Sequence, residues 1–151
     1  GFYQLPGVGI TGIKSYHDDC GGALRGENII YKFGMDGLEI CHLGDLGEEC
    51  SSELLEMILP VNILLIPVGG TYTIDAERAK EYVDRIMPEI VIPMHYKTRS
   101  LTLDLDKADV FLNLFDDEET EISQKNTLEF SRDDLTEEKT KIILMERMKI
   151  K

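Results

Sequence analysis

The sequence predicts a layered α/β fold in a single domain, and three observations support this prediction. Residues 63–68 form a continuous apolar segment, as expected for a strand covered on both faces of a sheet. Apolar residues at helical spacing precede and follow it, so the order strand, helix, strand, helix, strand runs across residues 38–94. A chain of 151 residues is also long enough to bury one hydrophobic core.

The N-terminal part is expected to consist of strands and turns. The predicted strands cover residues 1–5, 8–16, 28–33 and 38–43. Pro6-Gly7 is a turn pair between the first two strands, and Asp36-Gly37 carries the signature of a tight hairpin between the last two. Residues 18–27 contain three glycines and are expected to form a loop.

The middle of the chain contains two helices with clear start signals. Ser51 is a good N-cap for a helix over residues 52–59, and a second helix is expected to begin after Asp75 and cover residues 76–86. A proline follows each helix and ends it. Residues 90–94 then form the next predicted strand.

In the C-terminal part, predicted helices and strands alternate less regularly. Residues 107–115 have helical spacing, and residues 127–130 and 141–148 are expected to be late strands. The last of these is predicted to be an edge strand because its ends are charged. Two acidic stretches, residues 116–121 and 133–138, are expected to be solvated loops or helix starts.

The composition excludes several classes of function. A formal net charge of −13 with no cluster of basic residues argues against a surface for nucleic acid or an anionic membrane. No apolar run approaches the roughly 20 residues of a membrane-spanning helix. Three cysteines, Cys20, Cys41 and Cys50, are too few and too odd in number for a disulfide scaffold, so a cytoplasmic location is expected.

Potential metal ligands follow three of the predicted strands. His17, Asp45 and His95 each come just after a strand, and ligands of layered α/β proteins tend to bind at the carboxyl ends of strands. Imidazole and carboxylate groups suit a divalent metal, most of all zinc, with iron and manganese as alternatives. The competing interpretation is structural: two satisfied histidines, and an aspartate that caps the turn before Ser51.

Four motifs in this chain resemble the later motifs of the metallo-β-lactamase superfamily. They are SYHDDCGG, HLGDLG, LLIPVGGTYTID and IPMHYKT, within a resemblance that covers about residues 1–98. The branch it resembles most is that of metal-dependent hydrolases similar to ascorbate-phosphate lactonases. The resemblance implies an αββα sandwich with two metals at its rim.

In that arrangement, His17 would complete the ligands of the first metal, Asp45 would bridge both metals and His95 would complete the second. A metal-bound hydroxide would then attack an ester, lactone, amide or phosphoester of a small-molecule substrate.

One signature of the superfamily is absent from this chain. The segment His-x-His-x-Asp-His, which supplies most ligands, does not occur, and no two of the three histidines are close enough to form it. The chain is therefore expected to correspond to the C-terminal two-thirds of such a protein. A truncated chain, a proteolytic product, a split protein and a degenerate relative all remain open.

Two consequences follow from the absent segment. Metal binding by this chain alone is expected to be weak or absent, because three ligands would be divided between two metals. The apolar face of strands such as residues 63–68 is expected to be exposed. The chain is therefore predicted to pair with a companion N-terminal fragment or to form a homo-oligomer.

Further candidates lie beside the predicted ligands. Gly69, Gly70 and Thr71 are expected either to line the substrate cleft or to form a plain turn. Tyr96 and Lys97 are expected either to bind an oxyanion or phosphate of the substrate or to be ordinary surface residues.

The remaining polar residues near the motifs are not expected to bind the metals directly. Asp18 and Asp19 either tune or hydrogen-bond His17 or form a solvated loop pair. His42 is expected to lie behind the ligands or in the core. A structural zinc held by the cysteines and His42 is disfavoured, since Cys41 and His42 are adjacent in a strand and point to opposite faces.

Three classes of function follow from these observations. The leading one is a metal-dependent hydrolase that needs the absent metal motif for catalysis. The alternative is a non-catalytic fragment or degenerate relative that acts as a binding or assembly module. The third is an unrelated α/β binder of small molecules whose histidines coincide by chance.

Overall fold

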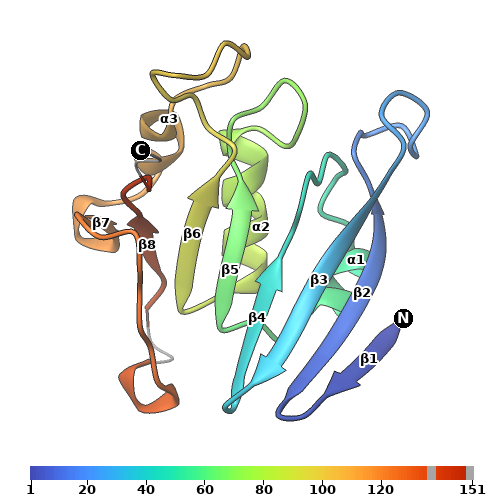
Figure 1. Cartoon of the computed structure of the whole chain (residues 1–151). Coiled ribbons are helices and arrows are strands. Elements are labelled where there is room, and N and C mark those ends of the chain that lie inside the picture. The colour runs from blue at the N-terminus through green and yellow to red at the C-terminus, as the bar shows by residue number, and fades with distance from the viewer. Residues whose placement is uncertain (136–138, 149–151) are drawn as a thin grey trace.

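The computed structural model describes residues 1–135 and 139–148 of the chain. In this part, eight strands form one mixed sheet in the order β1-β2-β3-β4-β5-β6-β8-β7 (Figure 1). The strands are β1 (Phe2–Leu5), β2 (Val8–Tyr16), β3 (Glu27–Met35), β4 (Leu38–His42), β5 (Ile63–Pro67), β6 (Ile90–Met94), β7 (Thr120–Ile122) and β8 (Lys141–Leu144). The helices are α1 (Ser52–Ile58), α2 (Ala76–Ile86) and α3 (Ala108–Leu112), with short 3₁₀ helices η1 (Asp117–Glu119) and η2 (Arg132–Asp134).

Strands β1 to β4 form an antiparallel meander, as the turn signals predict. The turn between β3 and β4 has positive φ angles at Asp36 (51°) and Gly37 (74°), the backbone that a two-residue hairpin favours. From β4 onward, every neighbouring pair of strands is parallel. Strands β2, β4, β5 and β6 therefore run in the same direction, and their carboxyl ends share one edge of the sheet.

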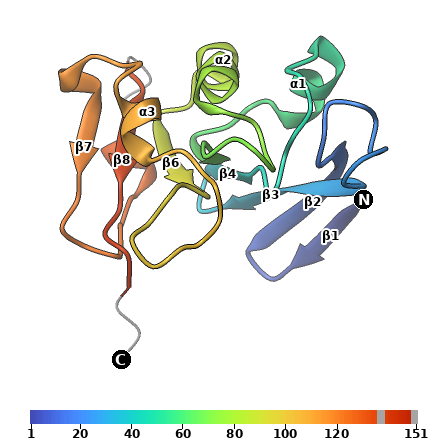
Figure 2. The same cartoon turned by 90° about the horizontal axis from the view of Figure 1, so that it is seen from above.

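Helices α1 and α2 begin where their capping residues predict. The Ser51 hydroxyl accepts a hydrogen bond from the Leu54 amide at 3.1 Å, and the Asp75 carboxylate accepts one from the Arg78 amide at 2.9 Å. Both helices lie on the same face of the sheet (Figure 2). No helix in the described residues has the length and hydrophobicity needed to cross a membrane.

The main hydrophobic core lies between these helices and the sheet. Helix α2 buries Tyr82 completely, helix α3 buries Phe111, and the strands contribute residues such as Leu64 and Val91. Cys41 belongs to this core, whereas the neighbouring His42 points to the other face of the sheet, as the strand alternation predicts.

The opposite face of the sheet is also apolar but is covered only in part. Four buried residues form a second cluster there: Leu38, Ile63, Ile90 and Ile143. The irregular segment that contains Leu128, Phe130 and Leu135 packs against this cluster. Toward β2 and β3 the face is open, and Ile29 and Tyr31 remain 48% and 43% exposed. An exposed apolar area is therefore present at β2 and β3, but the prediction that it includes residues 63–68 is wrong, because that segment is buried apart from the half-buried Leu65.

Two predictions for the C-terminal part are wrong. Residues 127–130 do not form a strand, because Leu128 and Phe130 cover the sheet instead of joining it. Strand β8 is not an edge strand either, since it lies between β6 and β7, and it ends at Leu144. The edge is formed by β7, which begins at the end of a stretch (residues 116–121) predicted to be a loop or helix start.

Helix starts are found at both acidic stretches. Helix η1 occupies the beginning of the first stretch, and η2 overlaps the beginning of the second. Residues 136–138 of the second stretch lie outside the described residues.

Candidate metal centre

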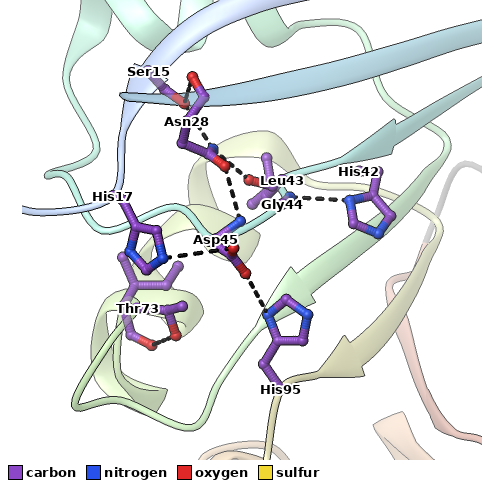
Figure 3. A network of polar contacts seen from close by, with 10 residues as sticks. Ser15, His17, Asn28, His42, Leu43, Gly44, Asp45, Thr73 and His95 are labelled. Atoms are coloured by element: carbon purple, nitrogen blue, oxygen red, sulfur yellow. Dashed lines mark hydrogen bonds and ion pairs between the residues drawn. The ribbon is translucent and has the colours of Figure 1, made fainter. Parts of the chain in front are cut away.

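The structure brings His17, Asp45 and His95 together at the carboxyl edge of the sheet (Figure 3). His17 Nε2 lies 3.5 Å from Asp45 Oδ2, and His95 Nδ1 lies 3.3 Å from Asp45 Oδ1. Each imidazole therefore faces a different oxygen of the same carboxylate. Residues 17, 45 and 95 come from the ends of β2, β4 and β6, which run in the same direction.

The distances fit a pair of metal positions that share Asp45. A tetrahedral ion with bonds of about 2.0–2.1 Å separates adjacent ligand atoms by roughly 3.3–3.5 Å. Each position would have two ligands from this chain, one imidazole and one carboxylate oxygen. No group of three or more His, Cys, Asp or Glu side chains in residues 1–135 and 139–148 is arranged to hold a metal by itself. The donor set therefore fits such ions but leaves each coordination shell incomplete.

His17 presents its Nε2 atom to Asp45, and its other ring nitrogen lies in the protein interior. Its Nδ1 atom is buried and has no hydrogen-bond partner among the described residues. The Asp45 side chain is 54% exposed and that of His95 41%, so the cluster opens to solvent.

Backbone conformation directs His95 toward Asp45. His95 follows β6 directly and adopts a left-handed φ of 55°, which is uncommon outside glycine. Gly69 packs against it so closely that an added Cβ would lie 2.0 Å from the His95 carbonyl oxygen. The absence of a side chain at Gly69 therefore permits the observed position of His95.

His42, the last residue of β4, contacts the turn that leads to Asp45. Its Nδ1 atom accepts a hydrogen bond from the Gly44 amide at 3.0 Å, so the ring proton of the neutral form sits on Nε2. Burial lowers the pKa of His42, and the nearby His95 lowers it further. A neutral His42 thus supports the turn that leads to Asp45.

Asp18 is neither a partner of His17 nor part of a solvated pair, which corrects both interpretations of this residue. Its carboxylate is buried and accepts four backbone hydrogen bonds within its own loop. The donors are the amides of Cys20 (3.0 Å), Gly22 (2.7 Å), Leu24 (2.9 Å) and Arg25 (2.7 Å). These bonds, that of Arg25 first, hold the pKa of Asp18 well below its usual range. Asp18 therefore shapes the loop that follows His17, whereas Asp19 is exposed.

This arrangement predicts an acid-sensitive contribution to stability. Because the pKa of Asp18 is lower in the folded than in the unfolded chain, its stabilisation is complete above the unfolded pKa of about 4 and is lost as the pH falls below it. Asp18→Asn replaces one acceptor oxygen by a donor, so the variant should melt several degrees lower at pH 7. Its melting temperature should also fall less steeply than that of the parent between about pH 5 and about pH 3, a range that brackets the unfolded pKa.

Thermal unfolding followed by circular dichroism measures this difference. Asp19→Asn, at the exposed neighbouring position, is the matched control and should keep the parental pH profile. An Asp18→Asn variant with the parental slope would contradict the prediction.

The glycine loop borders the cluster. Gly69 and Gly70 are buried, and Thr71 is exposed with a left-handed φ of 61°. The loop meets the one that Asp18 organises, since the Arg25 guanidinium lies 5.7 Å from the centre of the Tyr72 ring. Contact of these residues with a substrate stays a prediction.

Tyr96 and Lys97 are engaged within the protein. Tyr96 is partly buried and packs against the main core, and burial raises its pKa. The Lys97 ammonium donates a hydrogen bond to the Leu103 carbonyl. Their expected contact with an oxyanion or phosphate also stays a prediction.

The three cysteines form no site in the described part of the chain. All are free, with Cys20 exposed and Cys41 and Cys50 buried. This agrees with the absence of a disulfide scaffold and gives no support to a structural zinc.

Asn28 is a residue near the cluster that the sequence alone did not single out. It lies near the start of β3, and its side chain hydrogen-bonds the backbone on both sides of Gly44. Asparagine is uncommon within strands, which is the one local signal that could have marked it.

Comparisons with known proteins agree with this architecture. The family model "Beta-lactamase superfamily domain" matches residues 1–95. The chain superposes on a crystal structure from Thermotoga maritima, of the metallo-beta-lactamase superfamily, with a TM-score of 0.82 and 39% sequence identity. That match covers 96% of this chain and 68% of the other protein. A metallo-beta-lactamase fold protein from Bacillus subtilis, with a TM-score of 0.58 and 6% identity, supports the fold alone.

Curated relatives extend well beyond the matched region. A UPF0173 metal-dependent hydrolase of Thermococcus onnurineus is 33% identical over 97 residues, which cover 63% of this chain and 43% of the relative. Its counterpart in Thermoplasma acidophilum is 42% identical over 97 residues, covering 64% of this chain and 41% of the relative. The chain thus spans less than half of these relatives.

These similarities confirm the predicted fold class, a metallo-β-lactamase-type layered fold of which this chain makes up a part. They exclude the interpretation as an unrelated α/β binder. On the family match and the structural similarity together, the chain belongs to the metallo-β-lactamase superfamily.

Proposed function

We propose that this chain supplies one side of the active site of a metal-dependent hydrolase. The observation that carries the proposal is the position of the Asp45 carboxylate, whose two oxygens face His17 and His95 at 3.5 and 3.3 Å. The relatives from Thermococcus and Thermoplasma are named metal-dependent hydrolases, and the Thermotoga structure is described as a Zn-dependent one. Zinc is the proposed metal, because a set of imidazole and carboxylate donors suits it.

The residues of this chain would hold and orient the reacting groups. A metal bound there supplies Lewis acidity, which activates water at neutral pH and polarises the substrate. Asp45 would set the spacing of the two metal positions, and His17 and His95 would bind as neutral imidazoles. The exposed sides of Asp45 and His95 leave room for a small ester, lactone, amide or phosphoester.

The remaining ligands are proposed to come from a companion segment that covers the open sheet face. Two ligands per metal position are too few for a stable site, and tetrahedral zinc takes about four. The open face beside the cluster is apolar, with Ile29 and Tyr31 about half exposed. Association of two copies of the chain is the alternative. A monodisperse monomer at micromolar concentration would count against both.

Zinc binding by the purified chain, measured alone and with a relative's N-terminal segment added, tests the metal site. Competition with a chromophoric chelator should reveal zinc binding whose affinity falls at least about tenfold in His95→Ala and in Asp45→Asn. Asp84→Asn is the control, since Asp84 pairs with Lys80 on the surface of α2 and should leave the affinity unchanged. Equal zinc binding by all four proteins, or no zinc binding by the parent even with the N-terminal segment added, would contradict the proposal.

Hydrolysis separates the enzyme from the alternative function. A non-catalytic binding or assembly module is favoured by the incomplete ligand set. The zinc-loaded chain, alone and with a relative's N-terminal segment added, is assayed on chromogenic esters and phosphodiesters. Turnover that is lost in Asp45→Asn supports a hydrolase. Zinc binding without turnover, both by the chain alone and with the N-terminal segment added, supports a non-catalytic binding or assembly module.

A further inference from the structure

We propose that Asn28 is the positioning residue that fixes the Asp45 carboxylate between His17 and His95. The inference rests on the proposed function, because it assigns Asn28 a role toward the same metal centre. Asn28 itself touches neither histidine in the described contacts. It acts through the backbone of the turn that carries Asp45.

The Asn28 side chain holds this turn at two points (Figure 3). Its Oδ1 atom accepts a hydrogen bond from the Asp45 amide at 3.0 Å, and its Nδ2 group donates one to the Leu43 carbonyl at 2.9 Å. These two backbone groups lie on either side of Gly44, beyond the last residue of β4. One planar amide thus fixes both ends of the Leu43–Gly44–Asp45 turn.

A second strand holds Asn28 in place. Ser15 on β2 lies opposite Asn28 in the sheet register and is almost fully buried. Asn28 Nδ2 donates a hydrogen bond to the Ser15 hydroxyl at 2.8 Å, and that hydroxyl donates one to the Asn28 carbonyl at 3.2 Å. His17 lies two residues after Ser15. The network therefore ties the strand that leads to His17 to the turn that carries Asp45.

The turn itself is adapted to this contact. Gly44 has a left-handed φ of 63°, and a Cβ atom on it would lie 2.6 Å from Asn28 Oδ1. Any other residue would push the amide away from the turn. The Asp45 side chain, in contrast, contacts only the two imidazoles in the polar interactions described, so its position depends on its backbone.

The chain offers a close control for Asn28. Asn62 accepts a hydrogen bond from the Glu39 amide at 2.7 Å and donates one to Glu89 Oε1 at 2.9 Å. It thus bridges strand ends as Asn28 does, but at the opposite edge of the sheet. Asn62→Ala should weaken the fold without affecting the turn at Asp45.

Two measurements on the full chain test the role of Asn28. Amide hydrogen exchange without metal should show the Asp45 amide exchanging roughly tenfold faster in Asn28→Ala than in the parent, as expected for one lost hydrogen bond. Zinc affinity, measured by chelator competition, should fall about 10- to 100-fold in the same variant, as for other residues that orient metal ligands. Asn62→Ala should change neither quantity, although it lowers the melting temperature.

A milder variant keeps the test decisive if Asn28→Ala does not fold. Ser15→Ala removes a partner of Asn28 and touches no proposed ligand in the described contacts, so it should weaken zinc binding several-fold. Where Asn28→Ala folds, adding Ser15→Ala to it should reduce zinc affinity no further, because both residues act through one network.

The outcomes separate this inference from the proposed function. Unchanged exchange of the Asp45 amide in Asn28→Ala and Ser15→Ala, or equal effects of Asn62→Ala, would overturn the role of Asn28. If the parent binds no zinc even with a relative's N-terminal segment added, but Asn28→Ala speeds exchange of the Asp45 amide, the proposed function fails and Asn28 still positions the carboxylate.

Discussion

Gly69→Ala is expected to destabilise the protein by roughly 3 kcal/mol or more, at or beyond the upper end of the range for overpacked sites. The added methyl group would lie 2.0 Å from the His95 carbonyl oxygen, a backbone atom that cannot rotate away. The Gly69 carbonyl also accepts a hydrogen bond from the Asp106 amide at 2.8 Å, so the loop cannot shift without breaking it. Relief of the clash must therefore move His95, and zinc binding should fall together with stability.

Urea unfolding measures the change in stability, and chelator competition measures zinc affinity. Gly9→Ala is the matched control: Gly9 lies in β2 with no left-handed φ, and its added Cβ would have its closest contact at 3.4 Å from the Phe2 ring. Its stability should change by less than about 1 kcal/mol. A Gly69→Ala variant as stable as Gly9→Ala would show that the loop relaxes and that His95 does not depend on it.

Tyr82→Ala is expected to cost about 3–5 kcal/mol, the usual range for deleting a large aromatic side chain from a core. Tyr82 is completely buried on the face of α2 that packs against the sheet. Its hydroxyl donates a hydrogen bond to the Glu48 carbonyl at 3.0 Å, three residues after Asp45. The side chain therefore anchors α2 both to the core and to the loop that follows the candidate ligand.

Tyr82→Phe separates these two contributions, since it keeps the ring and should cost only about 1 kcal/mol for the lost hydrogen bond. Tyr3→Ala, at a position that is 65% exposed, should change stability by less than about 0.5 kcal/mol. All three are compared by urea unfolding. A loss below about 2 kcal/mol in Tyr82→Ala would mean that the core collapses into the space left by the ring.

Local signals were sufficient for most of the secondary structure. Ser51 and Asp75 predict the starts of α1 and α2, and Asp36-Gly37 predicts the β3–β4 turn, because each satisfies or shapes the backbone within a few residues. The late strands could not be predicted in this way. Residues 127–130 have strand-like composition, yet Leu128 and Phe130 pack on a sheet face that distant strands create.

The residues of the candidate site could also be predicted only in part. A strand end is visible in the sequence, so His17, Asp45 and His95 could be named as ligands, and family membership follows from their motifs. The burial of Asp18 could not be foreseen, because an acidic pair in a glycine-rich loop is usually solvated. Asn28 was missed because its partners, Ser15 and Leu43, are 13 and 15 residues away in the chain.

The sequence alone determined the layered α/β class, the strand ends that carry potential ligands and the acidic character of the chain, since these depend on residue order and composition. Tertiary structure alone decided that β2, β4 and β6 end at one edge, that β8 lies inside the sheet, and that one carboxylate faces two imidazoles. The physical reason is the sequence separation over which the interactions act. Caps, turns and periodicity act over a few residues, whereas strand order and side-chain convergence depend on contacts between segments far apart in the chain.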